Sequence, residues 1–371
     1  MRATRAIIYT DHFRHNLRQV RALAGPDREI CAAVKANAYG HGAVELSRIA
    51  LEEGVRRLAV ATVEEAAELR EAGIQARIVL LSLATPDEAP DIVSLELEPV
   101  VAREDFVALL GAEAARQSRR IAVHLKVDTG MGRIGVRPEE APALAAALDG
   151  QSALEIAGIA THFPVADTED SEFTREQVRA LDGAVAEIRA AGIDPGVIHA
   201  ANSGATLRYP GAHLDMLRPG IMLYGYYPSR EQRREVELKP VMELRSQLVF
   251  MKHVPAGTTV SYGRSWTAPR DTVIGTVPAG YADGYNRLLS NRAAVSVGGR
   301  ACPVVGRVCM DQFMVDLGPD PGAELYDEVV LFGPTPPAPT AEDIADLVDS
   351  IPYEVTCRVD ARVPRLYRRA L

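Results

Sequence analysis

One lysine stands directly behind an apolar, strand-like run and directly before a turn that contains two glycines. The run covers residues 30–34, the lysine is Lys35, and the turn ends at Gly42. A primary amine can lose its proton and attack a carbonyl carbon, which a guanidinium cannot do at ordinary pH. Lys35 is therefore a candidate for Schiff-base chemistry, and the alternative is a lysine with a buried stem and a hydrated amine. Arginine supplies nearly all of the 41 basic residues, and the lysines are Lys35, Lys126, Lys239 and Lys252.

The composition and length describe a globular chain with a sizeable core. Of the 371 residues, 47% are hydrophobic and 25% are charged, and the length suits one large domain with a smaller one. The net charge of −9 argues against a nucleic acid or a membrane surface as partner. No apolar run approaches the roughly 20 residues that span a bilayer, and the amino terminus lacks the apolar core of a signal peptide, so we expect a cytoplasmic protein. The cysteines follow no zinc-binding spacing, and no metal site is predicted.

Short β-rich runs alternate with segments of helical spacing between residues 30 and 220. The helical spacing is clearest at residues 63–70 and 174–190. Eight strands separated by helices predict a closed (β/α)8 barrel, while an open doubly wound sheet stays possible because periodicity does not show closure. The predicted strands cover residues 30–34, 58–61, 78–81, 97–101, 121–127, 154–161, 197–201 and 215–218.

The texture of the sequence changes after residues 239–240, where β-rich runs are separated by glycine and proline turns. The predicted fold class is therefore α/β, with a (β/α)8 TIM-type barrel in residues 1–238 and a mostly antiparallel β domain in residues 239–371. Residues 341–347 predict a helix, and the proline-rich residues 333–339 predict a surface loop. The predicted strands of the second domain cover residues 244–254, 272–277, 293–297, 302–308 and 328–331.

Polar residues and glycines cluster where five of the predicted barrel strands end. Lys35 follows the first strand, residues 126–133 the fifth, and His162 the sixth. Residues 200–204 and 217–221 follow the seventh and eighth. Because the active site of this fold lies at the carboxyl ends of the strands, the clustering predicts a site there.

The segments after the last two strands suit a phosphate group. Ser203 and Gly220 offer hydroxyl and backbone N–H donors at positions where this fold often binds phosphate. Taken singly, residues 202–203 also fit a helix cap and Gly220 a plain turn.

Ordered motifs along nearly the whole chain resemble the alanine racemase family, whose members use pyridoxal 5′-phosphate (PLP). The first half carries AVKANAYGHG around Lys35, KVDTGMGR around Lys126, THF at His162, ANS at Asn202 and LRPGIMLYG at Arg218. The second half carries VSYG around Tyr262, GYADG around Tyr281, GRVCMDQ around Met310 and IPYE around Tyr353. The resemblance implies an isomerase that interconverts L- and D-alanine and supplies D-alanine for peptidoglycan.

The resemblance also implies two opposed acid/base residues, Lys35 and Tyr262, on the two faces of the substrate. Lys35 would bind PLP covalently, and Tyr262 would come from the partner subunit of a homodimer with composite active sites. Arg133 would reach the phenolic oxygen of PLP and the substrate carboxylate. The Met310 N–H group would bind the same carboxylate.

The remaining roles follow from the same resemblance. Arg218 would face the pyridine nitrogen, with His162 beside the cofactor ring and in contact with Arg218. Lys126 resembles a position that carries a carbamate in many members of the family, and Asp311 would help to orient Lys35. Tyr281 would narrow access to the substrate site together with Tyr353. The other cofactor-binding residues would be Tyr39, Asn202, Ser203, Gly220, Ile221 and Tyr353, most of them on the phosphate; His41 and His199 are interpreted as structural.

Three other functions fit parts of the sequence. A PLP carrier without catalysis would resemble the barrel alone, so the second domain with Tyr262 counts against it. A decarboxylase of the same architecture would place an acid at the pyridine nitrogen, where this chain has Arg218. A racemase of wider substrate range, for example one that accepts serine, differs in pocket shape, and the bulky Tyr353 favours a small substrate.

Overall fold

A computed structural model describes residues 2–168, 172–232 and 236–369 of the chain. It divides into two compact units. We call the first the barrel unit, made of Arg14–Ala38 and Ala43–Leu238, and the second the β unit, made of Met1–Phe13, Tyr39–Gly42 and Lys239–Leu371. Among the described residues, no helix is long and apolar enough to cross a membrane.

The barrel unit contains eight parallel strands that follow one another around a single sheet, in the order β9-β2-β3-β4-β5-β6-β7-β8. The two end strands also meet, since the Asp215 N–H donates to the Ile198 carbonyl (3.0 Å) and the Arg218 N–H to the Ala201 carbonyl (2.8 Å). The sheet therefore closes, and the predicted barrel is confirmed. Each predicted strand overlaps one of the observed strands, which are β2 (Glu29–Ala33), β3 (Arg57–Val60), β4 (Arg77–Leu80), β5 (Glu98–Val101), β6 (Ile121–Lys126), β7 (Leu154–Ala160), β8 (Val197–His199) and β9 (Met216–Leu217).

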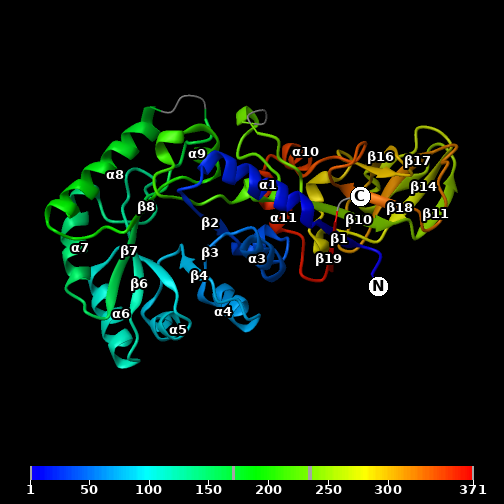
Figure 1. The fold of residues 1–371 in the computed structure, drawn as a ribbon. Helices are drawn as coiled ribbons and strands as arrows, with labels where there is room; N and C mark the ends of the chain where they lie inside the picture. Colours follow the sequence, from blue (N-terminus) through cyan, green and yellow to red (C-terminus); the bar gives the residue numbers. More distant parts are fainter. Residues whose placement is uncertain (1, 169–171, 233–235, 370–371) are drawn as a thin grey trace. The chain divides into compact units, whose positions relative to one another are not determined.

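Helices cover the outside of the barrel strands, and Figure 1 shows α6, α7 and α8 on the outer side of β6 and β7. Helix α4 illustrates why they form. Thr62 caps it in a reciprocal capping box with Glu65, and Val63, Ala66 and Leu69 form its buried face. The helices are α1 (Thr10–Ala24), α3 (Ala43–Glu52), α4 (Val63–Glu71), α5 (Ala89–Ser94), α6 (Glu104–Arg116), α7 (Ala141–Asp149), α8 (Glu172–Ala190) and α9 (Ser203–Arg208). Short 3-10 turns are η1 (Pro86–Glu88), η2 (Pro138–Glu140), η3 (Pro210–Ala212), η4 (Ile221–Tyr224) and η5 (Arg230–Gln232).

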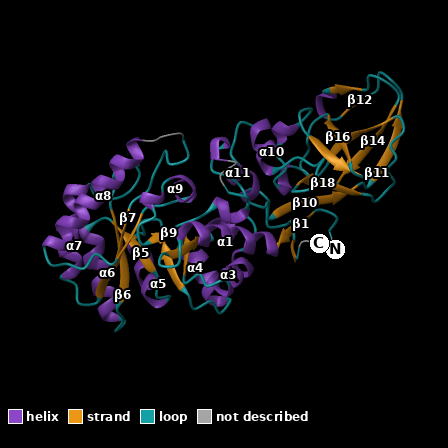
Figure 2. Ribbon diagram, turned by 45° about the horizontal axis from the view of Figure 1, so that its top comes forward, coloured by secondary structure: helices purple, strands orange, loops and turns teal. Residues whose placement is uncertain are grey.

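The β unit is built on a nine-stranded sheet in the order β11-β14-β17-β16-β15-β18-β10-β1-β19, several strands of which are drawn in orange in Figure 2. Its pairings are antiparallel except for β1 with β19, which confirms a mostly antiparallel domain. The strands are β1 (Arg5–Tyr9), β10 (Met242–Gln247), β11 (Phe250–Val254), β14 (Thr272–Val277), β15 (Ala294–Val297), β16 (Arg300–Val305), β17 (Phe313–Gly318), β18 (Glu328–Phe332) and β19 (Arg365–Arg368). The other elements are the β12 (Thr259–Val260) and β13 (Trp266–Thr267) pair, the helices α10 (Ala341–Leu347) and α11 (Pro352–Cys357), and the turns η6 (Tyr262–Arg264), η7 (Tyr281–Asp283) and η8 (Arg287–Leu289).

Two features of the β unit differ from the sequence prediction. The single strand predicted for residues 244–254 is two strands, β10 and β11, which lie at different places in the sheet. The Leu248 and Val249 N–H groups bond to Asp327 and Thr276 respectively, so the chain changes its partner strand at this point. Strand β1 also pairs with β10 and β19 of this sheet. A division of the chain at residue 238 instead assigns β1 to the barrel domain. An apolar run reveals a strand but not its partner.

Candidate functional site

Lys35 lies directly after β2, at the first residue of a short turn, α2 (Lys35–Tyr39), that winds in the left-handed sense. The backbone φ angles of residues 36–39 lie between 51° and 53°. Such a conformation costs L-residues about 1–2 kcal/mol each, so the surrounding structure must hold it. The Ala36 N–H donates to Glu65 (2.6 Å), whose other carboxylate oxygen accepts the Ala61 N–H (2.7 Å), and the Ala38 N–H donates to the Val34 carbonyl (2.7 Å). Glu65, in the helix of the next βα repeat, therefore holds the turn that carries Lys35.

Four basic side chains act electrostatically on the imidazole of His162, which follows the carboxyl end of β7. Burial lowers the pKa of His162 well below its ordinary value, and the charges of Arg218, Arg133, Lys126 and Lys35 lower it further. His162 is therefore neutral at neutral pH. Lys35, Lys126, Arg133 and Arg218 thus lie within electrostatic range of one ring, and their predicted roles stay predictions.

Lys126 ends β6 and is buried, with 5% of its surface exposed. Burial and then the charge of Arg218 lower its pKa to about 7, against the opposing effect of Asp128. Its amine donates to the Val127 carbonyl (3.0 Å). A buried amine that is partly neutral at neutral pH is chemically competent to react with carbon dioxide, so the predicted carbamate is compatible with this environment and stays a prediction.

Arg133 lies in a loop that backbone contacts hold in shape. The Asp128 carboxylate accepts the Gly130 N–H (3.0 Å) and the Gly132 N–H (3.1 Å), while the Asp128 N–H donates to the Val136 carbonyl (2.8 Å). These bonds close the loop at its base and hold its first half around the Asp128 carboxylate. Arg133 is exposed on this loop.

Arg218 follows β9 and is buried against the inside of the barrel. Its Nη1 donates to His199 Nδ1 (2.7 Å), and its Nη2 donates to the carbonyls of Thr161 (2.7 Å) and Ala200 (3.1 Å). Burial lowers its pKa to about 10, which still leaves it charged at neutral pH. Sequence analysis missed His199 as a partner of Arg218. The available signal was its place within the seventh predicted strand, residues 197–201.

Ser203 connects the loops after β8 and β9. Its Oγ accepts the Gly220 N–H (2.9 Å), and because a hydroxyl that accepts a bond still has its own proton to donate, it remains a donor for an anion. Asn202 caps α9 by accepting the Ala205 N–H (3.0 Å), and its amide donates to the Phe163 carbonyl (3.1 Å) after β7. Ile221 begins η4 directly after Gly220. Asn202 is thus a helix cap that also joins two strand-end loops.

In the β unit, three loops pack together and expose three large side chains. Tyr262 is 74% exposed, Met310 53% and Tyr281 43%. The Tyr281 N–H donates to the Cys309 carbonyl (3.0 Å), and Ser261, which precedes Tyr262, accepts the Arg307 N–H (2.9 Å). The loop of residues 307–310 therefore positions both tyrosines.

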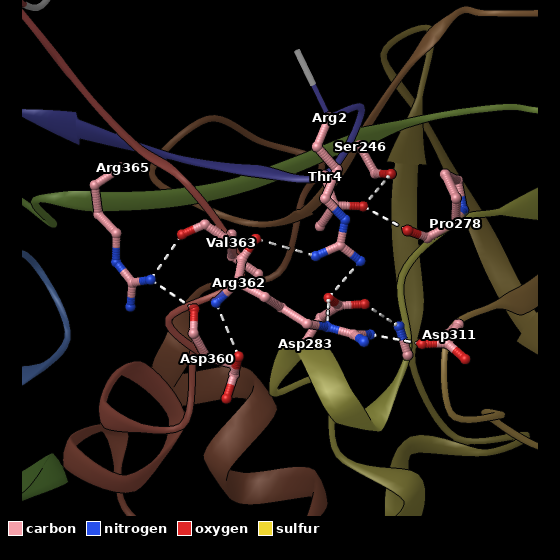
Figure 3. Close-up of polar contacts among 11 residues, drawn as sticks. Arg2, Thr4, Ser246, Pro278, Asp283, Asp311, Asp360, Arg362, Val363 and Arg365 are labelled. Carbon is pink, nitrogen blue, oxygen red and sulfur yellow. Dashed lines mark hydrogen bonds and ion pairs between the residues drawn. The ribbon is translucent and has the colours of Figure 1, made fainter.

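Arg362 binds two of these loops at once, as Figure 3 shows. Its guanidinium donates to Asp283 (2.7 Å) in the loop of Tyr281 and to Asp311 (2.8 Å), which follows Met310. Asp283 is fully buried and also accepts the Gly280 N–H (2.9 Å). Asp311 is thereby held by Arg362, while its predicted role toward Lys35 stays a prediction.

Tyr39 and Tyr353 lie side by side in the β unit, with ring centroids 5.9 Å apart. The segment that carries Tyr39 packs against α11, since a Cβ atom on Gly40 would lie 2.1 Å from the Thr356 carbonyl oxygen. The φ of Gly40 is +84°, so both space and backbone conformation require glycine at this position.

Comparison with known proteins gives one consistent result. Residues 8–228 match the family described as alanine racemase, N-terminal domain, and residues 241–367 match alanine racemase, C-terminal domain. An alanine racemase from Treponema denticola is 46% identical over 99% of this chain and 98% of its own length, and one from Desulforamulus reducens is 44% identical over 98% of both. Among solved structures, an alanine racemase of Clostridium difficile matches with a TM-score of 0.95 at 36% identity, over 100% of this chain and 96% of that one. An alanine racemase from D-cycloserine-producing Streptomyces lavendulae matches with a TM-score of 0.94 at 40% identity, over 100% and 98%.

The lowered pKa of Lys126 predicts how stability depends on pH. Between about pH 7 and the ordinary lysine value of about 10.4, the unfolded chain binds a proton at this position that the folded chain does not. The free energy of unfolding of the wild type should therefore rise with pH relative to Lys126→Met, by roughly 1.4 kcal/mol per pH unit within that window. Chemical denaturation of the two apoproteins in buffer free of carbon dioxide measures this difference. Lys252→Met, at an exposed position, is the control, and a pH-independent difference for Lys126→Met would contradict the prediction.

Proposed function

The chain belongs to the alanine racemase family, and from that premise we propose that it interconverts L- and D-alanine with PLP bound covalently to Lys35. The proposal rests on the place of Lys35 in the structure. Lys35 begins a left-handed turn after a barrel strand, and it belongs to the four basic residues that act electrostatically on His162. Both family matches together cover nearly the whole chain, which supports an activity that needs both domains.

The residues present fit PLP. Its phosphate and its phenolic oxygen are anionic, and the barrel mouth offers Lys35, Lys126, Arg133 and Arg218 together. When bound, PLP supplies an electron sink that makes the Cα proton of an amino acid removable. Arg133 would hold the phenolic oxygen and Arg218 would face the pyridine nitrogen. The residues that would hold the phosphate and the rest of the cofactor are Tyr39, His162, Asn202, Ser203, Gly220, Ile221 and Tyr353.

The charge of Arg218 supports a racemase rather than a decarboxylase. A guanidinium at the pyridine nitrogen only donates hydrogen bonds and disfavours protonation of that nitrogen. Arg218 placed there would weaken the electron sink and so restrain side reactions of the bound cofactor. Arg218 is buried and still charged at neutral pH, so it can act in this way.

Racemisation requires that a proton leave Cα on one face and return on the other. We assign the two faces to Lys35, which holds the proton at Nζ, and Tyr262, which holds it at Oη. The substrate carboxylate would be fixed by Arg133 and by the Met310 N–H group, so that the Cα–H bond points at one base or the other. Alanine fits this arrangement through its small side chain, and D-alanine is the product that peptidoglycan synthesis consumes.

We further propose that each active site is composed of two chains in a homodimer. Tyr262, Tyr281 and Met310 are large side chains that are exposed in the single chain and presented by one group of loops. A site at a barrel mouth also needs a cover that excludes water, and a second copy of this group of loops would supply it.

Loss of Lys35 should abolish both activity and covalent attachment of the cofactor. Borohydride reduction of the wild type loaded with PLP should fix the cofactor to the peptide that contains Lys35, as measured by mass spectrometry. Lys35→Ala should release all PLP on denaturation and should not change the optical rotation of L-alanine, whereas the exposed control Lys252→Ala should behave as wild type. A Lys35→Ala protein that still traps PLP would overturn the assignment.

Tyr262→Phe should retain PLP but lose one half of the reaction. Because Lys35 would serve the D enantiomer, the variant should exchange the Cα hydrogen of D-alanine with deuterium from D2O far faster than that of L-alanine. Proton NMR of the alanine methyl signal measures both rates, with Tyr326→Phe, another exposed tyrosine, as control. Equal loss for the two enantiomers would show one base acting on both faces.

Two inactive variants should complement each other if the site is shared between chains. In a mixed dimer of Lys35→Ala and Tyr262→Ala, one site receives both substitutions and the other receives neither. Random exchange makes half of the dimers mixed, so activity should return to roughly a quarter of the wild-type value per chain. Mass spectrometry of the intact dimer establishes that exchange occurred, and absence of activity after proven exchange would show that the site is not shared in this way.

A further inference from the structure

A chain of buried polar side chains runs through the interior of the barrel, where bulky branched residues are the usual filling. It begins at Arg218, beyond the carboxyl end of β9, and continues through His199 and His124 to Glu98 and Arg57, which are the first residues of β5 and β3. All five are buried, and both histidines are fully so. The chain therefore connects the two ends of the barrel.

The hydrogen-bond distances along this chain leave only one arrangement of protons. Arg218 can only donate, so His199 Nδ1 (2.7 Å away) must accept and its proton must lie on Nε2. That proton is donated to His124 Nδ1 (3.0 Å), and His124 in turn must donate from Nε2 to Glu98 Oε2 (3.1 Å). Both imidazoles are consequently neutral Nε2–H tautomers, and their rings meet edge to face with centroids 4.8 Å apart.

Glu98, which accepts the hydrogen bond from His124, stays ionised. Burial opposes ionisation of Glu98, but the hydrogen bond from His124 and the charges of Arg57 and Arg77 outweigh it and hold the pKa of this carboxyl below its usual range. Arg57 donates to the same oxygen (3.0 Å) and also pairs with Glu29, while Arg77 pairs with the other oxygen. Because Glu98 stays an acceptor, the direction of every bond above it is set.

We propose that Glu98 and His124 are positioning residues for the racemase, acting through His199 to fix the guanidinium of Arg218 against the cofactor. The assignment rests on the proposed function, since Arg218 affects catalysis only if it faces the pyridine nitrogen. Three of its five N–H groups are bound inside the barrel, to His199, Thr161 and Ala200, which leaves two for the cofactor. The rotation of the guanidinium plane is thereby determined before PLP binds.

The two imidazoles also lie between Arg218 and the carboxylate of Glu98. A carboxylate in direct contact would neutralise Arg218 locally and weaken its effect on the pyridine nitrogen. Neutral imidazoles satisfy the guanidinium without adding an opposite charge, while Glu98 is paired with Arg57 and Arg77 instead. Reversal of the chain would turn a His199 N–H toward Arg218, so that two donors would oppose each other.

The protonation pattern is tested in the apoprotein, independently of racemase activity. Nitrogen-15 NMR of protein labelled at histidine should show two of the eight histidines as neutral Nε2–H tautomers that do not titrate between pH 8 and 5.5. The signals are identified by their loss in His124→Gln and His199→Gln. An Nδ1–H tautomer or a cation at either position would overturn the proposal, whatever the fate of the proposed function.

The positioning role is tested with Glu98→Gln, because a glutamine amide can donate to His124 and so permits the chain to reverse. In the PLP-loaded enzyme, kcat for alanine should fall roughly tenfold, as for other residues that orient a catalytic group indirectly, with KM little changed. The absorption maximum of the bound cofactor should shift. Glu243→Gln is the matched control, since Glu243 is an equally buried, arginine-paired acid in the β unit, and it should leave kcat and the spectrum unchanged.

A second pair of variants covers the case in which Glu98→Gln does not fold. His199→Asn keeps an oxygen acceptor close to the position of Nδ1 and should preserve the cofactor spectrum and most of kcat, while His199→Leu should lose both. Unchanged spectra and kcat in Glu98→Gln, or in both His199 variants, would overturn the positioning role while the racemase function stands. A wild type without alanine racemisation would instead overturn the proposed function and leave the NMR result as a property of the fold.

Discussion

The gathering of positive charge at the mouth of the barrel is the constraint on which the rest of the site depends. Lys126 and Arg218 are buried there, and together with Lys35 and Arg133 they act electrostatically on His162. Like charges repel strongly where water is excluded, and burial disfavours the charged form of each group. The pKa of Lys126 is lowered to about 7 and that of Arg218 to about 10, and Arg218 keeps its charge while it donates to the neutral imidazole of His199. What remains is a net positive field at the strand ends, which suits an anionic cofactor.

The barrel could be predicted from the sequence because each of its strands is a short apolar run between amphipathic helical segments. The ends of these runs also identified the segments around Lys35, Lys126 and Arg218. The pairing of β1 with β10 could not be predicted, because an apolar run carries no information on a partner more than two hundred residues away. The same limit applies to residues 244–254, where continuous β-rich sequence hides a change of partner strand.

The polar chain under Arg218 was beyond sequence reasoning for a different reason. His124 lies between valine and leucine in a strand, and this pattern indicates an ordinary core histidine whose side chain is hydrogen-bonded. Glu98 and Arg57 begin their strands, where charged residues normally face solvent. Only the order of the strands in the sheet, in which β5 lies beside β6 and two strands from β3, shows that these side chains can bond in series. The contacts of His199 likewise appear only when β8 and β9 are neighbours.

The turn after β2 shows how the same fold makes the lysine available. Of residues 36–38, only Asn37 is of a type that often adopts left-handed backbone, and the two alanines favour the right-handed form. The conformation is supported by Glu65, which accepts the Ala36 N–H together with the Ala61 and Thr62 N–H groups at the start of its own helix. Glu65 is available because Thr62 caps its helix, which fixes the carboxylate at the start of α4. The position of Lys35 is thus determined by the neighbouring βα repeat, in the same way that the position of Arg218 is determined by the barrel interior.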